Sequence, residues 1–155
     1  LHLTVPEQHS YHELQHLINQ LLSQRGLSPT LRLLRAMMGE KDLLEVLPQQ
    51  LIEDFILQQA PLTFGLQASE LMSHQGPEYR ALRMACMHLL HTWCKYPHQR
   101  IAELMRLSRR SVGYYITRSE SQLMLPAFHP DYVKPFQAME HQLIQFLYQQ
   151  INEYA

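Results

Sequence analysis

The chain has 155 residues, which is enough for one compact domain or for one domain with a helical extension. Its hydrophobic content of 46% can supply a real core, and its net charge of −1 gives no overall attraction to nucleic acid. Any binding to nucleic acid must therefore come from a local basic surface. Apolar and polar residues rarely alternate strictly and glycine occurs only five times, so we expect an all-α fold.

Residues 1–76 are predicted to form an N-terminal helical region that supports the fold or binds a protein partner. Its first helix, over residues 10–24, ends before Gly26. This helix is expected to turn one apolar stripe inward, made of Leu14, Leu17, Ile18, Leu21 and Leu22. Further helices are expected over residues 29–39, from a cap at Asp42 to about residue 48, over residues 48–59 and, as a short turn, near residues 68–73.

The same region holds a rival motif, because His12, Glu13 and His16 match the H-E-x-x-H pattern of zinc hydrolases. No third ligand stands at a convincing spacing, and both histidines fall opposite the leucine stripe, where they should face water. The zinc hydrolase is therefore kept only as a remote alternative. We expect no metal, no other cofactor and no catalytic activity.

Residues 77–123 are predicted to hold a helix-turn-helix, which follows a long helix over residues 78–94. Pro97 opens the first of its two helices, on which the small Ala102 allows a close crossing. Ile101 and Met105 are predicted on the inner side of this first helix. Ser108 is a natural N-cap for the second helix, over residues 109–120, on which Val112, Tyr115 and Ile116 share the inner side. An ordinary helical hairpin with a solvated basic face is the alternative.

One position departs from the usual pattern of such turns. A left-handed residue follows the first helix, and glycine adopts that conformation most easily. This chain has Arg106 instead. Either the turn is built differently, or Arg106 bears some strain.

Double-stranded DNA is the expected partner of the second helix, because a helix in the major groove reads bases with its first turns. Arg109 and Arg110 suit guanine edges or phosphates, and Gly113 permits close approach to the sugar-phosphate wall. Residues 95–118 carry six basic residues against one acid, Glu103, which is typical of a phosphate-binding surface. The candidate DNA-binding residues are Arg83, Lys95, Arg100, Ser108, Arg109, Arg110, Ser111, Gly113, Tyr114, Thr117 and Arg118.

About residues 80–123 resemble the C-terminal DNA-binding domain of the bacterial chromosomal replication initiator, which belongs to the same all-helical class as the tryptophan repressor. The residues that fit are Arg83, Met87, Leu89, Ile101, Val112 and Arg118. The resemblance implies duplex DNA binding, with Arg83 in the minor groove. The family's Arg-Asp-His-Thr-Thr run is absent and residues 108–111 stand in its place, so the family's origin specificity does not carry over.

Residues 124–155 are predicted to form a proline-containing linker, over residues 125–135, and a final helix from about Asp131 or Pro135 to Tyr154. This helix has a wide apolar arc, made of Phe136, Met139, Leu143, Ile144, Phe146, Leu147 and Ile151. The arc fits either packing in the core or a homodimer contact, and both stay open.

The two cysteines, Cys86 and Cys94, lie about 12 Å apart along one predicted helix, too far for a disulfide, and this favours the cytoplasm. No apolar run approaches the roughly 20 residues of a membrane span. We therefore expect a nucleoid-associated DNA-binding protein, either a transcriptional regulator or an accessory factor in replication or in a mobile element. A protein-interaction module that uses the helices as a scaffold is the alternative.

Overall fold

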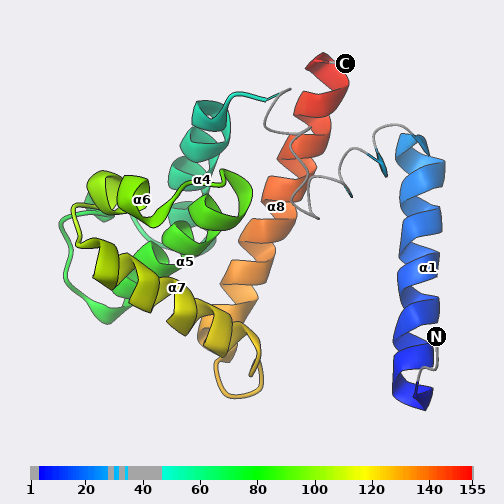
Figure 1. The fold of residues 1–155 in the computed structure, drawn as a ribbon, viewed down its shortest axis with the longest axis horizontal. Coiled ribbons are helices and arrows are strands. Elements are labelled where there is room, and N and C mark those ends of the chain that lie inside the picture. Colours follow the sequence, from blue (N-terminus) through cyan, green and yellow to red (C-terminus); the bar gives the residue numbers. More distant parts are fainter. Residues whose placement is uncertain (1–3, 28–29, 32–33, 35–46, 155) are drawn as a thin grey trace.

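The computed structural model describes residues 4–27, 30–31, 34 and 47–154. These residues form α-helices, one 3-10 helix and no strand, which confirms the all-α class. The helices are α1 (Val5–Arg25), α4 (Gln49–Thr63), α5 (Pro77–Trp93), α6 (His98–Met105), α7 (Arg109–Leu123) and α8 (Pro130–Tyr154), with the 3-10 helix η1 (Ala68–Glu70). Figure 1 shows α4 to α8 gathered in one bundle, with α1 to one side of it.

The first helix begins earlier than predicted because a capping box closes its N-terminus. The backbone N–H of Thr4 donates to Glu7 Oε2 at 2.7 Å, and the N–H of Glu7 donates back to Thr4 Oγ1 at 3.4 Å. The helix ends before Gly26, as expected. Its leucine stripe does not enter the bundle, since Leu14 and Leu17 are 53% and 50% exposed. The expectation of an inward stripe is therefore wrong at these two positions.

Two predicted helices of the N-terminal region, over residues 29–39 and from Asp42 to about residue 48, lie mostly outside the described residues. The next one is α4, which runs four residues beyond the predicted end and passes through Pro61. Ile52, Ile56 and Ala60 are fully buried on its inner side. Since α4 packs on α5 and α8, part of the N-terminal region belongs to the same core as the later helices.

The core is centred on α5, which contacts α4, α6, α7 and α8. Leu82, Ala85, Leu89 and Leu90 on this helix are fully buried. Cys86 and Cys94 are both free and buried, so the two thiols form no disulfide with each other, as the spacing predicted. Burial raises the pKa of the Cys86 thiol to about 12, so this group stays protonated near neutral pH.

The last helix, α8, starts at Pro130, and the loop before it is therefore shorter than the predicted linker over residues 125–135. Pro130 occupies the first helical position, where a missing N–H costs least, and Pro135 lies inside the helix. Phe136, Met139 and Leu143 are buried in the bundle core. Within one chain the apolar arc of α8 thus has a partner, while a homodimer contact stays a prediction.

A buried polar network ties α8 to α5 and α7. The hydroxyl of Ser119 on α7 is fully buried, lies 2.7 Å from His88 Nδ1 on α5, and hydrogen-bonds the Tyr132 hydroxyl on α8. Trp93 adds a second link, because its Nε1 donates to Glu140 Oε2 on α8 at 3.2 Å. These bonds satisfy polar groups that burial would otherwise leave unpaired, and they fix the C-terminal half of α7.

Within the described part of the chain, no helix combines the length and the apolar character that crossing a bilayer requires.

Candidate nucleic-acid interface

The helices α6 and α7 are joined by a turn of three residues, 106–108. Arg106 has φ 56° and ψ 44°, the left-handed conformation, and its N–H donates to the carbonyl of Ala102. The N–H of Leu107 reaches the same carbonyl at 2.9 Å. Of the two alternatives, the second therefore holds: Arg106 is left-handed and carries the backbone strain that a glycine would avoid, about 1–2 kcal/mol for an L-residue.

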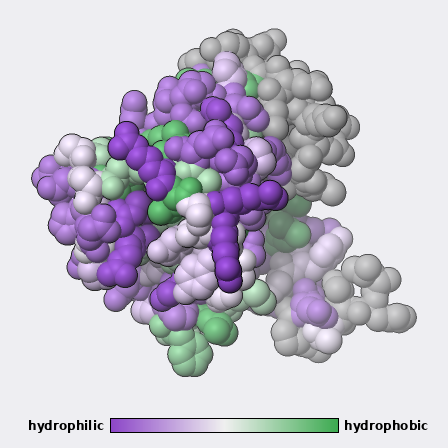
Figure 2. Space-filling model, turned by 60° about the vertical axis from the view of Figure 1, so that its left-hand side comes forward, coloured by the Kyte–Doolittle hydropathy of each residue, from purple (hydrophilic) through white to green (hydrophobic). Residues whose placement is uncertain are grey.

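The faces that α6 and α7 turn toward each other and the core are those predicted from the sequence. Ile101, Ala102 and Met105 are buried on α6, and Val112 and Ile116 are buried on α7. The opposite side of α7 is left exposed, at Arg110, Tyr114, Thr117 and Arg118. Figure 2, which brings this side of the bundle forward, shows a mainly hydrophilic face.

Ser108 is the N-cap of α7, as predicted. Its Oγ accepts a hydrogen bond from the backbone N–H of Ser111 at 3.1 Å and lies 2.8 Å from Ser111 Oγ. Both hydroxyls are thus already engaged at the helix start. Their predicted contacts with phosphate stay predictions.

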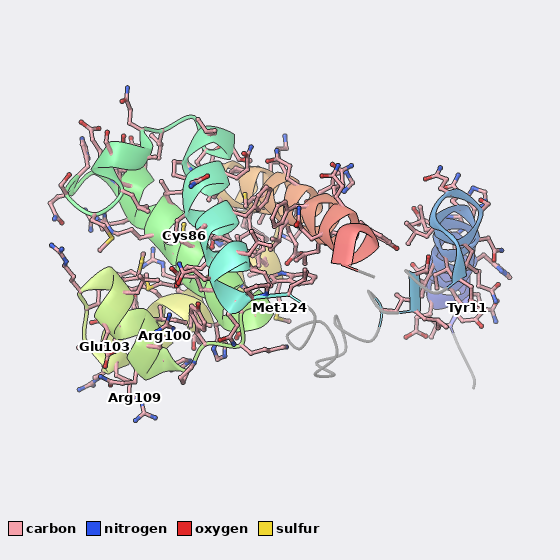
Figure 3. All side chains as sticks on the ribbon, turned by 90° about the horizontal axis from the view of Figure 1, so that it is seen from above. Tyr11, Cys86, Arg100, Glu103, Arg109 and Met124 are labelled. Carbon is pink, nitrogen blue, oxygen red and sulfur yellow. The ribbon has the colours of Figure 1, made fainter. Side chains whose placement is uncertain are left out.

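Arg109 and Arg110 lie in the first turn of α7, and both are exposed. Neither side chain forms an ion pair or a hydrogen bond with a described residue. In Figure 3 the Arg109 side chain extends outward at the edge of the molecule. The carboxylate of the nearby Glu103 accepts instead from Gln99 Nε2 at 3.2 Å, so both guanidinium groups are available to an external ligand.

Further along α7, Tyr114 and Arg118 form a pair on the surface. Arg118 Nη1 donates to the Tyr114 hydroxyl at 3.1 Å, and the Tyr114 side chain is 58% exposed. Its ring packs edge-on against Tyr115, with 5.4 Å between the ring centroids. Thr117 is also exposed. These residues continue the exposed face that begins at Arg110.

Gly113 lies closer to the protein than expected. It is half-buried, and a Cβ at this position would lie 3.5 Å from His98 Nδ1 on α6. The glycine thus lets the start of α6 come near α7. Its predicted close approach to a sugar-phosphate wall stays a prediction.

Two of the predicted arginines, Arg83 and Arg100, have partners inside the protein. Arg83 Nη1 donates to the carbonyls of Leu71 and His74, at 2.9 and 2.7 Å, and so holds the segment between η1 and α5. Lys95 differs from both, because it is exposed at the turn between α5 and α6, with φ 59°.

The guanidinium of Arg100 lies over the ring of Tyr96, 4.4 Å from its centroid, and its Nη2 is 3.7 Å from Glu53 Oε1. Glu53 is buried, and this oxygen has no hydrogen-bond partner, so Arg100 is the cation that balances it. Burial raises the pKa of the Tyr96 hydroxyl, and the hydrogen bond from Arg100 lowers it in part. Arg100 on α6 is therefore linked to α4 by this ion pair.

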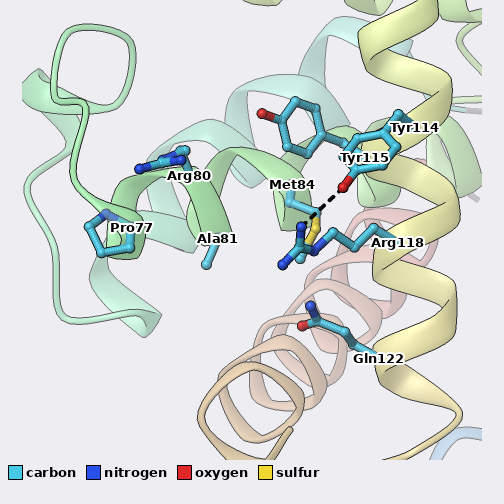
Figure 4. A pocket seen from close by; sticks show the side chains of 8 residues that line it. All are labelled: Pro77, Arg80, Ala81, Met84, Tyr114, Tyr115, Arg118 and Gln122. Atoms are coloured by element: carbon cyan, nitrogen blue, oxygen red, sulfur yellow. Dashed lines mark hydrogen bonds between the residues drawn. The ribbon is translucent and has the colours of Figure 1, made fainter.

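The structure adds a feature that the sequence did not reveal, a groove of about 380 Å³ between the start of α5 and the outer side of α7. Figure 4 shows Arg80 on one side of it and Arg118 on the other. Its described lining residues are Pro77, Arg80, Ala81, Met84, Tyr114, Tyr115, Arg118 and Gln122. Arg80 lies outside the basic stretch of residues 95–118, and only the packing of α5 on α7 brings it near Arg118.

The histidine motifs hold no metal site in the part of the chain that is described, where no three His, Cys, Asp or Glu side chains are grouped to hold an ion. His12 and His16 are exposed on α1. His88 Nδ1 pairs with Ser119, and His91 Nδ1 lies 2.9 Å from the carbonyl of Tyr96. His88 and His91 are thus engaged by groups inside the protein.

Comparison of the chain with protein-family models, with curated proteins and with solved structures found no match.

Proposed function

We propose that the chain binds duplex DNA, with α6, the turn at residues 106–108 and α7 acting as a helix-turn-helix. The observation that carries the proposal is the state of Arg109 and Arg110, which are exposed on the first turn of α7 without a partner among the described residues. A guanidinium can bind guanine O6 and N7 with two hydrogen bonds, and it can equally bind a phosphate. The positive end of the helix dipole adds to the attraction for phosphate.

The candidate contacts fall into two groups. Arg109, Arg110, Tyr114, Thr117 and Arg118 lie on the exposed side of α7 and can meet DNA without rearrangement. The second group lies at or near the start of the same helix, where it would contact the sugar-phosphate backbone of DNA; it consists of Ser108, Ser111 and Gly113.

Lys95 is a further exposed cation among the candidates and suits a phosphate. Arg83 and Arg100 would have to leave internal partners to touch DNA, and for Arg100 this would leave the buried Glu53 without its cation. We therefore rank these two arginines last among the contacts.

Transcriptional regulation is the role that we infer for such a module, followed by an accessory role in replication or in a mobile element. A two-fold homodimer would present two copies of α7 to paired half-sites. Because the core covers Phe136, Met139 and Leu143, a dimer through α8 would have to use the side of α8 that the bundle leaves exposed.

A protein-interaction module is the second candidate, and one observation favours it. Leu14 and Leu17 are about half exposed on α1, which lies beside the bundle (Figure 1). Two neighbouring apolar side chains on a helix provide a surface that a protein partner could cover. In that case α6 and α7 would serve only as a scaffold.

Charge reversal tests the DNA proposal. We expect Arg109→Glu and Arg110→Glu each to weaken binding to a random duplex pool, and the double variant to weaken it further. Lys134→Glu on α8 is the matched control, because Lys134 is exposed and its replacement by glutamate also reverses one charge. The slope of log affinity against log salt should become shallower by about 0.9 for each phosphate that the variant no longer neutralises. Equal affinity of the double variant and the Lys134→Glu control would refute the proposal and leave the interaction module.

A further inference from the structure

The groove between α5 and α7 has the composition of a binding site for an anion that carries a flat ring. Its described lining residues include two arginines and two tyrosines but no carboxylate. The Arg80 side chain makes no hydrogen bond or ion pair with any described residue. An unneutralised pair of cations facing one hollow attracts an anion, because the charges repel each other until one binds.

The two walls of the groove supply different chemistry. Arg118 comes from α7, and the Tyr114 hydroxyl accepts its Nη1 hydrogen at 3.1 Å, which holds the guanidinium in place. Arg80 comes from the first turn of α5, whose N-cap, Gly76, provides no side-chain hydrogen bond to the free N–H groups. The start of α5 adds its positive dipole to the charge of Arg80, and the acidic Glu78 on the same turn offsets part of it.

The remaining surface of the groove is suited to an aromatic ring. Tyr114 is more than half exposed, its orientation is set by the edge-on contact with Tyr115, and Met84 and Ala81 form an apolar wall on α5. Bases stack on exposed tyrosine rings in nucleic-acid-binding proteins. A volume of about 380 Å³ lies in the range of small-molecule sites.

We propose that this groove binds one nucleotide, with its phosphate between Arg80 and Arg118 and its base against Tyr114. This site shares Tyr114 and Arg118 with the proposed duplex-reading surface, but it reads a different form of nucleic acid, because the base must be unpaired to reach the tyrosine. The nucleotide is either free in solution or the unpaired end of a nucleic-acid strand. The same chemistry serves both sources, and binding in the groove does not require α7 to enter a major groove.

The test measures binding of 5′-AMP to the full chain by calorimetry. We expect 5′-AMP to bind more tightly than either adenosine or inorganic phosphate. Arg80→Ala and Arg118→Ala should each weaken 5′-AMP binding by about tenfold, since each removes a charge-assisted hydrogen bond. Tyr114→Phe keeps the ring but removes the hydroxyl that bonds Arg118, so it should weaken 5′-AMP binding less than Tyr114→Ala does. Lys134→Ala on α8 should bind 5′-AMP like the parent chain.

A second arm of the experiment distinguishes the two sources. A duplex with a single-stranded overhang is compared with the blunt duplex, in the parent chain and in Arg80→Ala. If the overhang duplex binds more tightly than the blunt duplex in the parent chain but not in Arg80→Ala, and 5′-AMP does not bind, the ligand is a strand end. If 5′-AMP binds as well, the groove also accepts a free nucleotide. The inference is overturned if neither binds through Arg80 and Arg118, or if inorganic phosphate binds as tightly as 5′-AMP. Blunt-duplex binding is scored separately, so it can fail or succeed independently.

Discussion

Replacement of Arg106 by glycine should stabilise the protein, although it removes a side chain from the surface. Arg106 is held at φ 56° and ψ 44°, and an L-residue in this region costs about 1–2 kcal/mol that glycine does not incur. Glycine also makes the unfolded chain more flexible, which costs about 0.4–1 kcal/mol. The difference predicts a net gain of about 0.5–1 kcal/mol for Arg106→Gly.

The gain can be measured as a change in the urea midpoint and in Tm. For a chain of this length, about 1 kcal/mol corresponds to a rise of roughly 2–4 °C. Arg106→Asn should give a smaller gain, since asparagine tolerates the left-handed region better than arginine does. Lys95→Gly repeats the test at a second position, because Lys95 is the other non-glycine residue with positive φ among the described residues, at 59°.

Arg106→Ala separates the backbone effect from the loss of charge. Alanine keeps the Cβ and so keeps the strain, while it removes the guanidinium. If Arg106→Ala stabilises as much as Arg106→Gly, the gain comes from relief of charge repulsion and not from the backbone of the turn. A loss of stability in Arg106→Gly would likewise refute the strain at this residue.

Two further predictions concern buried polar groups. Desolvation lowers the pKa of His88; the nearby Glu120 opposes this shift and His91 reinforces it. Below pH about 6.5 the unfolded chain therefore binds a proton at this histidine that the folded chain does not bind. Stability should therefore fall as pH drops through this range, and His88→Asn should make urea midpoints fall less steeply; equal pH profiles would contradict this. Arg100→Ala should lower the urea midpoint, because the buried Glu53 loses its cation, and the effect should be modest because the guanidinium is half-exposed. Adding Glu53→Gln should recover part of this loss. If the effects of the two substitutions on stability are fully additive, the ion pair contributes nothing.

The helices around the turn could be predicted from the sequence because their signals are local. Ser108 caps the helix that follows it, and Val112 and Ile116 are apolar at helical spacing, so both the start and the inner face of α7 were correctly placed. The same holds for α5, whose apolar residues lie between Pro77 and the turn at Lys95.

What the sequence did not reveal depends on packing between distant segments. Nothing in the local pattern shows that Arg83 bonds the carbonyls before α5, or that Arg100 balances Glu53 from α4. Arg80 joins Arg118 at the groove only because α5 crosses α7. The leucine stripe of α1 has the right periodicity, but periodicity does not say which surface covers it.

The chain contains a single tryptophan, and its position makes it an optical reporter of the core. Trp93 is buried where α5 meets α8, and its indole N–H is bonded to Glu140. Detachment of α8 would bring the indole into water and shift its fluorescence to longer wavelength. An oligonucleotide bound to the first turn of α7 should leave that emission unchanged. Tryptophan fluorescence can therefore distinguish loss of folding from loss of binding in every variant.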